Sequence, residues 1–234
     1  MSIIENTCEF IDQIFDALCK NIEGDHFNDL FLKYVANNVE QSKWFSKEVK
    51  SIRHSLEKDL DFFFISDPAA HSKEEIILAY PGYLAISYYR VAHILYELEY
   101  FLIARIISEK AHKLTGIDIN PGAKIASPFF IDHGTGIVIG ETTIIGKNVK
   151  MYQGVTLGAL SLSRGNALQG NKRHPTIGNN VTIYAGVSIL GNIVIGDNVT
   201  IGSNAFITED IPSDMTITIA KPKHIVKKKK TKQK

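Results

Sequence analysis

Apolar residues recur at every sixth position through the second half of the chain. From Ile177 to Ile207 an isoleucine stands at each sixth residue, and a second apolar register follows four residues after each of them. A helical period near 3.6 does not keep such a ladder on one face, and the two-residue period of a plain strand does not explain the Gly, Asn and Asp residues between the rungs. A six-residue repeat with small turn residues is typical of a parallel β-helix, in which three hexads close one triangular coil and residues about 18 apart stack.

The ladder begins after Gly116 and is interrupted once. In its first block one register runs in steps of six from Ile119 to Val155, and its phase differs from that of the block after Ile177. The segment between the two blocks, about residues 159–176, has no ladder, so we expect it to be extruded from the coil as a loop. Long loops in solenoid proteins more often have a function than not.

The first half of the chain follows a helical pattern. Residues 3–22 place apolar side chains at alternating spacings of three and four, and residues 28–65 continue in the same way. Asp67, directly before a proline, reads as the N-cap of a helix with proline at its first position. Residues 72–75 read Ser-Lys-Glu-Glu, which predicts a capping box.

A long helix is expected after Pro81-Gly82, extending to about Thr115, with Gly116 as its C-terminal stop. The chain is therefore predicted to be α+β. Its expected parts are an α-helical domain over 1–116, a left-handed parallel β-helix over 117–212 and a C-terminal segment with a lysine-rich tail over 213–234.

Charge and cysteine content exclude some functional classes. The tail over 227–234 holds six lysines, and removing six positive charges from the net charge of +1 leaves −5 for the body. The body is therefore not a nucleic-acid binder by charge, and the tail is expected to be disordered. Cys8 and Cys19 form no CxxC pair, which favours core thiols in a reducing compartment. We see no signal peptide or membrane span, so we expect a cytoplasmic protein.

A few polar residues interrupt the aliphatic hexads. They are Asp118, Asp132, His133 and, across the loop, His174. By count of six, His133 falls at the position that Met151 fills one coil later, and a histidine there is either structural or catalytic. Asp118 lies 15 residues before His133, nearly one coil, so its carboxylate could orient the imidazole. No Ser or Cys stands beside His133, which leaves the nucleophile to the substrate.

Several short segments carry a resemblance to a known family. They are Asp118–Ile125, Asp132–Gly136, Gly140–Thr142, Gln153–Gly158 and Lys172–Pro175. Together these segments resemble serine O-acetyltransferase, a hexapeptide-repeat acyltransferase and the first enzyme of cysteine synthesis. The likeness also covers Asp67–Ala69 and the helix around Tyr88–Arg90, and the length of the expected loop resembles the long-loop subgroup.

The resemblance implies an activity and a set of residue roles. The family transfers an acetyl group from acetyl-CoA to the hydroxyl of L-serine, giving O-acetyl-L-serine and CoA. His133 resembles the general base, Asp118 its dyad partner and His174 a second active-site histidine. Asp67 and Asp132 match the carboxylates that hold the serine ammonium, and Arg173 matches the cation that binds the serine carboxylate. Opposite charges for both ends of a zwitterion also make chemical sense.

Acetyl-CoA is the expected co-substrate, and no metal is expected. The family pattern runs the pantetheine arm along the prism, in a site between two subunits. The residues expected to contact CoA are the stacked pair Ala185 and Ser203, Gly158 and Ala159 where the loop departs, and Lys221 and Lys223 at the phosphates. The two lysines have an alternative reading as plain surface charge.

The prism shape predicts a homotrimer, and in many family members the helical domain pairs trimers into a dimer of trimers. The family's partner, cysteine synthase, captures a tail that ends in isoleucine, whereas this sequence ends at Lys234, which argues against that complex. The family often has His where this chain has Asn120, and the loop length puts feedback inhibition by cysteine in question.

Three other functions are compatible with a hexapeptide-repeat β-helix. A hexapeptide-repeat O-acetyltransferase acting on a sugar or xenobiotic would lack the helical domain and the Asp67 segment. A zinc-dependent carbonic anhydrase on the same prism needs three histidines around the metal, and the ladder offers His133 and His174. A non-catalytic β-helix scaffold would leave Asp118, Asp132 and Arg173 without a purpose.

Overall fold

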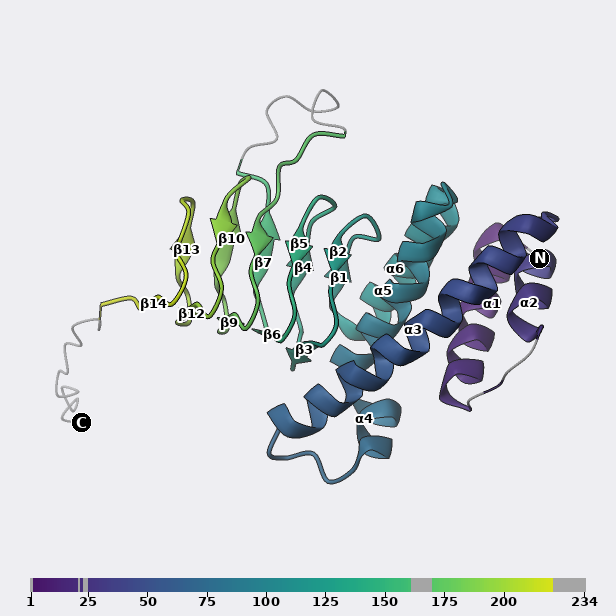
Figure 1. Ribbon diagram of the computed structural model, residues 1–234, viewed down its shortest axis with the longest axis horizontal. Coiled ribbons are helices and arrows are strands. Elements are labelled where there is room, and N and C mark those ends of the chain that lie inside the picture. Colours follow the sequence, from purple (N-terminus) through teal and green to yellow (C-terminus); the bar gives the residue numbers. More distant parts are fainter. Residues whose placement is uncertain (1, 21, 23–24, 161–169, 221–234) are drawn as a thin grey trace, which may run out of the picture.

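The computed structural model describes residues 2–20, 22, 25–160 and 170–220. The expected CoA contacts of Lys221 and Lys223, half of the expected loop and the lysine-rich tail lie outside the described residues. The described chain has a helical region followed by a parallel β-helix, so the predicted α+β fold is confirmed. Figure 1 shows the helices gathered at one end of the β-helix, with the later coils extending away from them.

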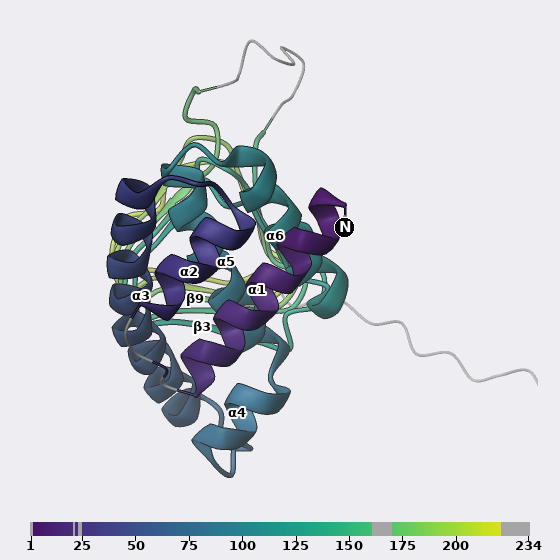
Figure 2. The same cartoon turned by 90° about the vertical axis from the view of Figure 1, so that its right-hand side faces the viewer.

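Six α-helices form the first part of the described chain. They are α1 (Ile3–Cys19), α2 (His26–Tyr34), α3 (Val39–Ser66), α4 (Lys73–Ala79), α5 (Pro81–Glu97) and α6 (Phe101–Thr115). In the view of Figure 2, α1 and α2 lie farthest from the β-helix and α5 lies behind them. Phenylalanines fill the core of the outer helices: the ring of Phe45 lies 5.8 Å from that of Phe10 and 5.2 Å from that of Phe31.

The helical pattern was predicted correctly, but two of its breaks were missed. Residues 28–65 contain a helix boundary at Asn38, whose side chain accepts a hydrogen bond from the amide of Gln41 at 3.0 Å and so caps α3. The single helix expected after Pro81-Gly82, extending to about Thr115, is two helices, because the chain turns at Glu99, which has a positive φ of 66°. The predicted stop at Gly116 is confirmed, since this residue adopts the left-handed conformation.

Asp67 is not an N-cap. It is the C-cap of α3, which continues up to Ser66 and stops just before the proline. The predicted capping box is half formed: Ser72 accepts from the amide of Glu75 at 3.1 Å, but the Glu75 carboxylate accepts from the amide of His71 at 2.8 Å, not from that of Ser72.

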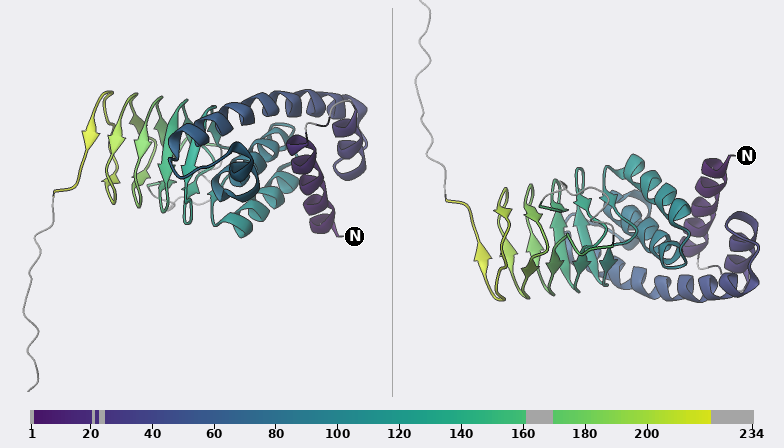
Figure 3. Two further views of the ribbon diagram at one scale, coloured as in Figure 1. Left: turned by 90° about the horizontal axis from the view of Figure 1, so that it is seen from below. Right: turned by 90° about the horizontal axis from the view of Figure 1, so that it is seen from above.

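The β-helix has three parallel sheets, one for each face of the triangular prism (Figure 3). Sheet A has the order β1-β4-β7-β10-β13, sheet B the order β11-β8-β5-β2, and sheet C the order β14-β12-β9-β6-β3. Their bounds are β1 (Asp118–Ile119), β2 (Lys124–Ile125), β3 (Phe129–Asp132), β4 (Val138–Ile139), β5 (Ile144–Ile145), β6 (Val149–Tyr152), β7 (Thr156–Gly158), β8 (Thr176–Ile177), β9 (Thr182–Ile183), β10 (Ser188–Leu190), β11 (Val194–Ile195), β12 (Thr200–Ile201), β13 (Phe206–Ile207) and β14 (Thr216–Ile217).

After the loop the coil has the expected length. Ile177 pairs with Ile195, and Ile183 with Ile201, so stacked residues are 18 apart. Across the loop Ile145 pairs with Ile177, 32 positions on, so this coil contains 14 residues more than an ordinary one. The extra residues fall between the two blocks of the ladder, where an extruded segment is expected.

The register predicted for the first block is wrong. Ile119 pairs with Ile139, and Ile131 with Met151, so stacked residues in the first coil are 20 apart. Two extra residues lie in the turn after β3, which contains His133. Ile131 therefore fills the slot that corresponds to Met151, and His133 lies outside the interior ladder.

The helical domain covers the first coil of the prism. The hydroxyl of Tyr89 on α5 donates to the carbonyl of Ala123 at 2.5 Å and accepts from the amide of Ile125 at 3.1 Å. At Gly82, also on α5, a Cβ would lie 2.3 Å from the carbonyl oxygen of Ile131, so only glycine allows this approach.

Among the described residues, no helix is both long enough and apolar enough to span a membrane.

Candidate active site

Sheet A separates two edges of the prism. The turns that follow the strands of sheet C form what we call the first edge, with His133, Gln153, Ala185 and Ser203 in successive coils. Backbone bonds stack these turns, since Gly186 donates to Gln153 and Asn204 donates to Ala185, both at 2.9 Å. The turns that follow the strands of sheet A form the second edge.

His133 projects from the first edge. Its φ is +56°, and its side chain is 70% exposed. The backbone around it is tightly held: the amide of Gly136 donates to the carbonyl of Gly116 at 2.8 Å, and a Cβ on Gly134 would lie 2.4 Å from Ile117 Cδ1. The imidazole Nδ1 lies 3.6 Å from Oδ1 of Asp132. A rigid turn thus presents an accessible imidazole beside a carboxylate.

Asp118 lies close to the same turn in the fold. Its amide donates to the carbonyl of Ile137 at 2.9 Å, and its side chain is half-buried. Between Asp118 and His133, however, no hydrogen bond or ion pair forms within the described part of the chain; the carboxylate nearest the imidazole belongs to Asp132. The dyad of Asp118 and His133 stays a prediction.

Asp67 and Asp132 face the same pair of tyrosines. Tyr80 donates to Asp67 Oδ2 at 2.7 Å, while the amide of Ala69 donates to Oδ1 at 2.8 Å. The hydrogen bond to Asp67 raises the pKa of Tyr80 to about 12, with smaller contributions from burial and from nearby carboxylates that include Asp132. Tyr152 stands next to Asp132 in sheet C, and burial, then the charges of Asp132 and Asp67 among others, raise its pKa.

The structure therefore places Asp67 and Asp132 near the same two tyrosines, with His133 beside Asp132, and the roles of the three residues stay predictions. Sequence reasoning missed the two tyrosines of this group. Tyr152 could have been found from the coil spacing, because it lies one coil after Asp132, but only with the 20-residue length of the first coil.

His174 lies on the second edge, where the chain rejoins the coil after the loop. It is 7% exposed. Its Nδ1 accepts a hydrogen bond from the amide of Thr142 at 3.1 Å, which assigns the proton of the neutral ring to Nε2. Burial, followed by the positive charges of Arg173 and Lys172, lowers the pKa of His174 to about 4. His174 is therefore a neutral imidazole at pH 7.

Arg173 and its neighbours anchor the returning chain. The Arg173 guanidinium forms an ion pair with Glu141, whose carboxylate also accepts from the hydroxyl of Tyr96 at 3.0 Å. Burial opposes ionisation of Glu141, but the hydrogen bonds from Arg173 and Tyr96 lower its pKa overall. Lys172 Nζ donates to the carbonyl of Thr142 at 2.7 Å. Glu141 lies in the segment Gly140–Thr142, which resembles the family, but the sequence pattern gave no sign of its role.

The expected CoA contacts are divided between the edges. Ala185 and Ser203 stack on the first edge, as expected from their spacing, in the same column as His133. Gly158 ends β7 on the second edge, where its carbonyl accepts from the amide of Gly191 at 2.9 Å, and Ala159 follows it. Across the ranges that the structure describes, no cluster of three His, Cys, Asp or Glu side chains could hold a metal ion.

One chain thus carries two groups of charged side chains, separated by sheet A. The first edge holds an exposed histidine with two carboxylates nearby, and the second edge holds an arginine with a buried neutral histidine. Such a pair of groups suits a zwitterionic substrate.

Comparison with known proteins places the chain in a family. Residues 174–209 match the model described as bacterial transferase hexapeptide (six repeats). The chain is 40% identical over 233 residues to a plasmid serine acetyltransferase of Synechococcus elongatus, covering 93% of this chain and 73% of that protein. It is 47% identical over 176 residues to the serine acetyltransferase of Helicobacter pylori, covering 75% of this chain and 97% of that one.

Solved structures agree with these relatives. Native serine acetyltransferase 1 of Entamoeba histolytica has a TM-score of 0.75 and 42% identity, covering 83% of this chain and 74% of that chain. The Neisseria gonorrhoeae serine acetyltransferase in complex with serine has a TM-score of 0.70 and 33% identity, covering 79% and 74%. A serine acetyltransferase in complex with CoA has a TM-score of 0.66 and 32% identity, covering 76% and 71%. The chain therefore belongs to the serine acetyltransferase family of hexapeptide-repeat acyltransferases.

Proposed function

We propose that this chain transfers the acetyl group of acetyl-CoA to the hydroxyl of L-serine, giving O-acetyl-L-serine and CoA for cysteine synthesis, with His133 as the general base. The observation that carries the residue assignment is the gathering of Asp67, Asp132 and His133 at the first edge, beside Tyr80. Relatives solved with serine and with CoA support the choice of the two substrates.

The reaction requires two transfers of one proton, both carried out by His133. His133 takes the proton of the serine hydroxyl while the oxygen attacks the thioester carbonyl. When the C–S bond breaks, the imidazolium returns the proton to the departing CoA sulfur. The exposed imidazole suits this task because both substrates must reach it, and Asp118 and Asp132 stabilise the imidazolium. His174, neutral at pH 7, keeps an Nε2–H that can donate a hydrogen bond in the same site.

Serine is held through its two charges. Asp67 and Asp132 bind the ammonium, and Arg173 binds the carboxylate. In one chain these groups lie on opposite edges of sheet A, so we propose that each complete site forms between the first edge of one subunit and the second edge of the next. Glu141 already pairs with Arg173 and would orient its guanidinium toward the substrate.

The same geometry favours a homotrimer. If sheet A faces a three-fold axis, the first edge of each prism meets the second edge of its neighbour, and three copies close the ring. Val138 and Phe206, on the outer surface of sheet A, are 39% and 67% exposed and would be covered in this packing. Light scattering should give three times the chain mass of 26.0 kDa, or six times that mass for a dimer of trimers. A monomeric mass would contradict the shared site.

CoA would then run along the first edge, away from His133 and past Ala185 and Ser203, with Gly158 and Ala159 contributed by the second edge of the neighbouring subunit. The column of stacked turns supports this path, since it starts at the proposed base. The cytoplasmic location and the roles of Lys221 and Lys223 remain predictions of the sequence.

One assay tests the proposed reaction. CoA release from acetyl-CoA is measured with L-serine, with L-homoserine and with a sugar acceptor at equal concentrations. We expect L-serine to give the highest kcat/KM. Release that requires the sugar, with no activity toward L-serine, would instead assign the chain to another acetyl acceptor.

A further inference from the structure

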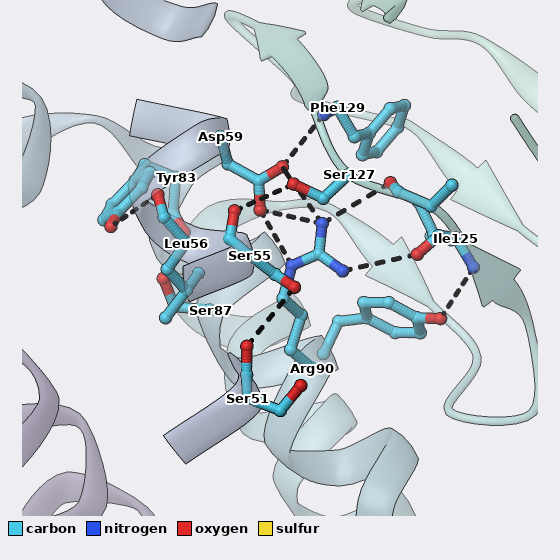
Figure 4. Close-up of polar contacts among 12 residues, drawn as sticks. Ser51, Ser55, Leu56, Asp59, Tyr83, Ser87, Arg90, Ile125, Ser127 and Phe129 are labelled. Atoms are coloured by element: carbon cyan, nitrogen blue, oxygen red, sulfur yellow. Dashed lines mark hydrogen bonds and ion pairs between the residues drawn. The ribbon is translucent and has the colours of Figure 1, made fainter. Parts of the chain in front are cut away.

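A buried ion pair joins the helical domain to the first coil of the β-helix (Figure 4). The side chain of Asp59 on α3 is fully buried, and that of Arg90 on α5 is 8% exposed. Arg90 Nε donates to Asp59 Oδ2 at 2.8 Å, and Nη2 donates to Oδ1 at 3.0 Å. The two parallel bonds give the pair a fixed orientation.

The pair also binds the strand that leads to the active site. Asp59 Oδ1 accepts from the amide of Phe129, the first residue of β3, at 2.9 Å, and from the hydroxyl of Ser127 at 3.0 Å. Arg90 Nη1 donates to the carbonyl of Ile125 at 3.3 Å. Figure 4 shows the carboxylate and the guanidinium side by side between the helices and the start of β3. The pair therefore holds α3, α5 and β3 through directional bonds.

The elements joined at this point carry the proposed ammonium ligands. Along α3, Asp67 follows Asp59 by eight residues, or about 12 Å of helix. Along β3, Asp132 follows Phe129 by three residues, or about 10 Å of strand, and His133 comes next. The rings of Phe63 and Phe130 also pack between α3 and β3, with centroids 4.8 Å apart, but they make no hydrogen bond there. A shift at Asp59 would therefore move Asp67 relative to Asp132.

Stability alone is a weak reason for such a pair. Burying two charges costs desolvation energy, and replacing both partners by apolar residues of similar volume is often neutral or stabilising. Apolar side chains, however, cannot bind the amide of Phe129 or the carbonyl of Ile125. We propose that Asp59, held by Arg90, is a positioning residue of the acetyl-transfer site, which fixes β3 against α3 and thereby sets the separation between Asp67 and the neighbouring Asp132 and His133.

This inference rests on the proposed function, because it takes Asp67 and Asp132 as the groups that hold the serine ammonium. It predicts a defect in serine use that is not matched by a defect in acetyl-CoA use. A misplacement of about 1 Å in a catalytic site can cost on the order of 100-fold in rate.

The test compares the full wild-type chain with two test variants and one control variant. The double variant Asp59→Leu/Arg90→Met removes both charges and keeps apolar volume. Asp59→Asn keeps an acceptor for the Phe129 amide but loses the charge that orients Arg90. Glu57→Gln is the control, since Glu57 lies on the same helix with a side chain that is 63% exposed. The melting temperature of each protein is measured first. Its kcat and its KM for each substrate are then measured well below that temperature.

We expect kcat/KM for L-serine to fall about tenfold or more in the double variant and less in Asp59→Asn, with the KM for acetyl-CoA within about twofold of wild type and Glu57→Gln unchanged. If the double variant does not fold, Asp59→Asn decides by the same selective loss. A folded variant with wild-type kcat/KM for L-serine, or with the KM for acetyl-CoA raised as much as the KM for L-serine, would overturn the positioning role. A wild-type chain without serine-dependent CoA release would overturn the proposed function instead.

Discussion

Ile131 lies directly opposite Met151 in sheet C, so the first coil of the β-helix has 20 residues, two more than the 18 of the coil from Ile183 to Ile201. The extra residues fall in the turn that contains His133, and this turn places the imidazole outside the packed interior. The proposed base is thus separated from the core that stabilises the fold.

His133→Asn should therefore remove activity without reducing stability. Asparagine tolerates the positive φ of this position, so the turn should be kept while the imidazole is lost. We expect kcat to fall by about 10²–10⁴-fold, the usual contribution of a general base. Because the side chain is largely exposed, the free energy of unfolding should stay within about 0.5 kcal/mol of wild type. Turnover and urea unfolding measure the two effects.

His54→Asn provides the matched control for that variant. The side chain of His54 is 69% exposed, lies on α3 and has the exposed Glu57 as its ion-pair partner. Its replacement should change neither turnover nor unfolding. Wild-type turnover in His133→Asn would rule out His133 as the base.

The imidazole of His174 lies against the backbone of Gly140. A Cβ at this glycine would be 2.1 Å from Cδ2 and 2.2 Å from Nε2 of the ring, which is anchored by its bond from the Thr142 amide. Gly140→Ala should therefore cost about 1–3 kcal/mol of unfolding free energy, as overpacking usually does. In a His174→Ala background the same substitution should cost less, because the ring is gone, and urea unfolding of the four proteins gives the coupling energy. Additive costs would mean that the ring moves aside freely.

The sequence predicted the β-helix but not the length of its first coil. The six-residue ladder is visible because each rung needs an aliphatic side chain. Ile137 and Ile139 are both apolar, however, so either could continue the ladder from Ile131, and the local pattern did not choose between them. The pairing of Ile139 with Ile119 decides the register, and that is a contact between coils.

Local rules also failed where tertiary packing sets the outcome. The motif around Asp67 resembled an N-cap, although a proline after it is equally a signal for the end of the preceding helix. Tyr80, Tyr152 and Glu141 join the site through contacts made only in the folded chain. The resemblance grouped Asp67, Asp132 and His133, but the sequence could not show that Asp59 and Arg90 link the elements that carry them.

Burial of neutral His174 should make stability depend on pH. Its pKa is about 4 in the folded chain, against an ordinary value of 6.5, so the unfolded chain binds a proton first as the pH falls. Its contribution to stability is therefore complete above about pH 6.5 and is lost progressively down to about pH 4. The loss should be of order 1–3 kcal/mol between pH 7.5 and pH 4.5.

His174→Gln isolates this contribution, since a glutamine can accept from the Thr142 amide but does not titrate. Urea unfolding of wild type and variant at both pH values, at one fixed protein concentration, should show a steeper decline for wild type. Parallel declines would mean that His174 is protonated in the fold or that its ring is solvated.

Two inactive variants should restore activity when they share a trimer. His133→Asn damages the first edge, and Arg173→Gln damages the second. In the proposed trimer each site joins the first edge of one subunit to the second edge of the next. An Arg173→Gln chain has an intact first edge, and a His133→Asn chain has an intact second edge. In a random mixture of the two chains, a site is therefore intact wherever these two edges meet. For equal amounts this is about a quarter of all sites. Co-expression or joint refolding followed by the CoA-release assay should therefore recover about a quarter of wild-type activity. Each variant refolded alone serves as the control. Mixed trimers with no activity above that of the single variants would place the whole site within one chain and contradict the arrangement of the two edges.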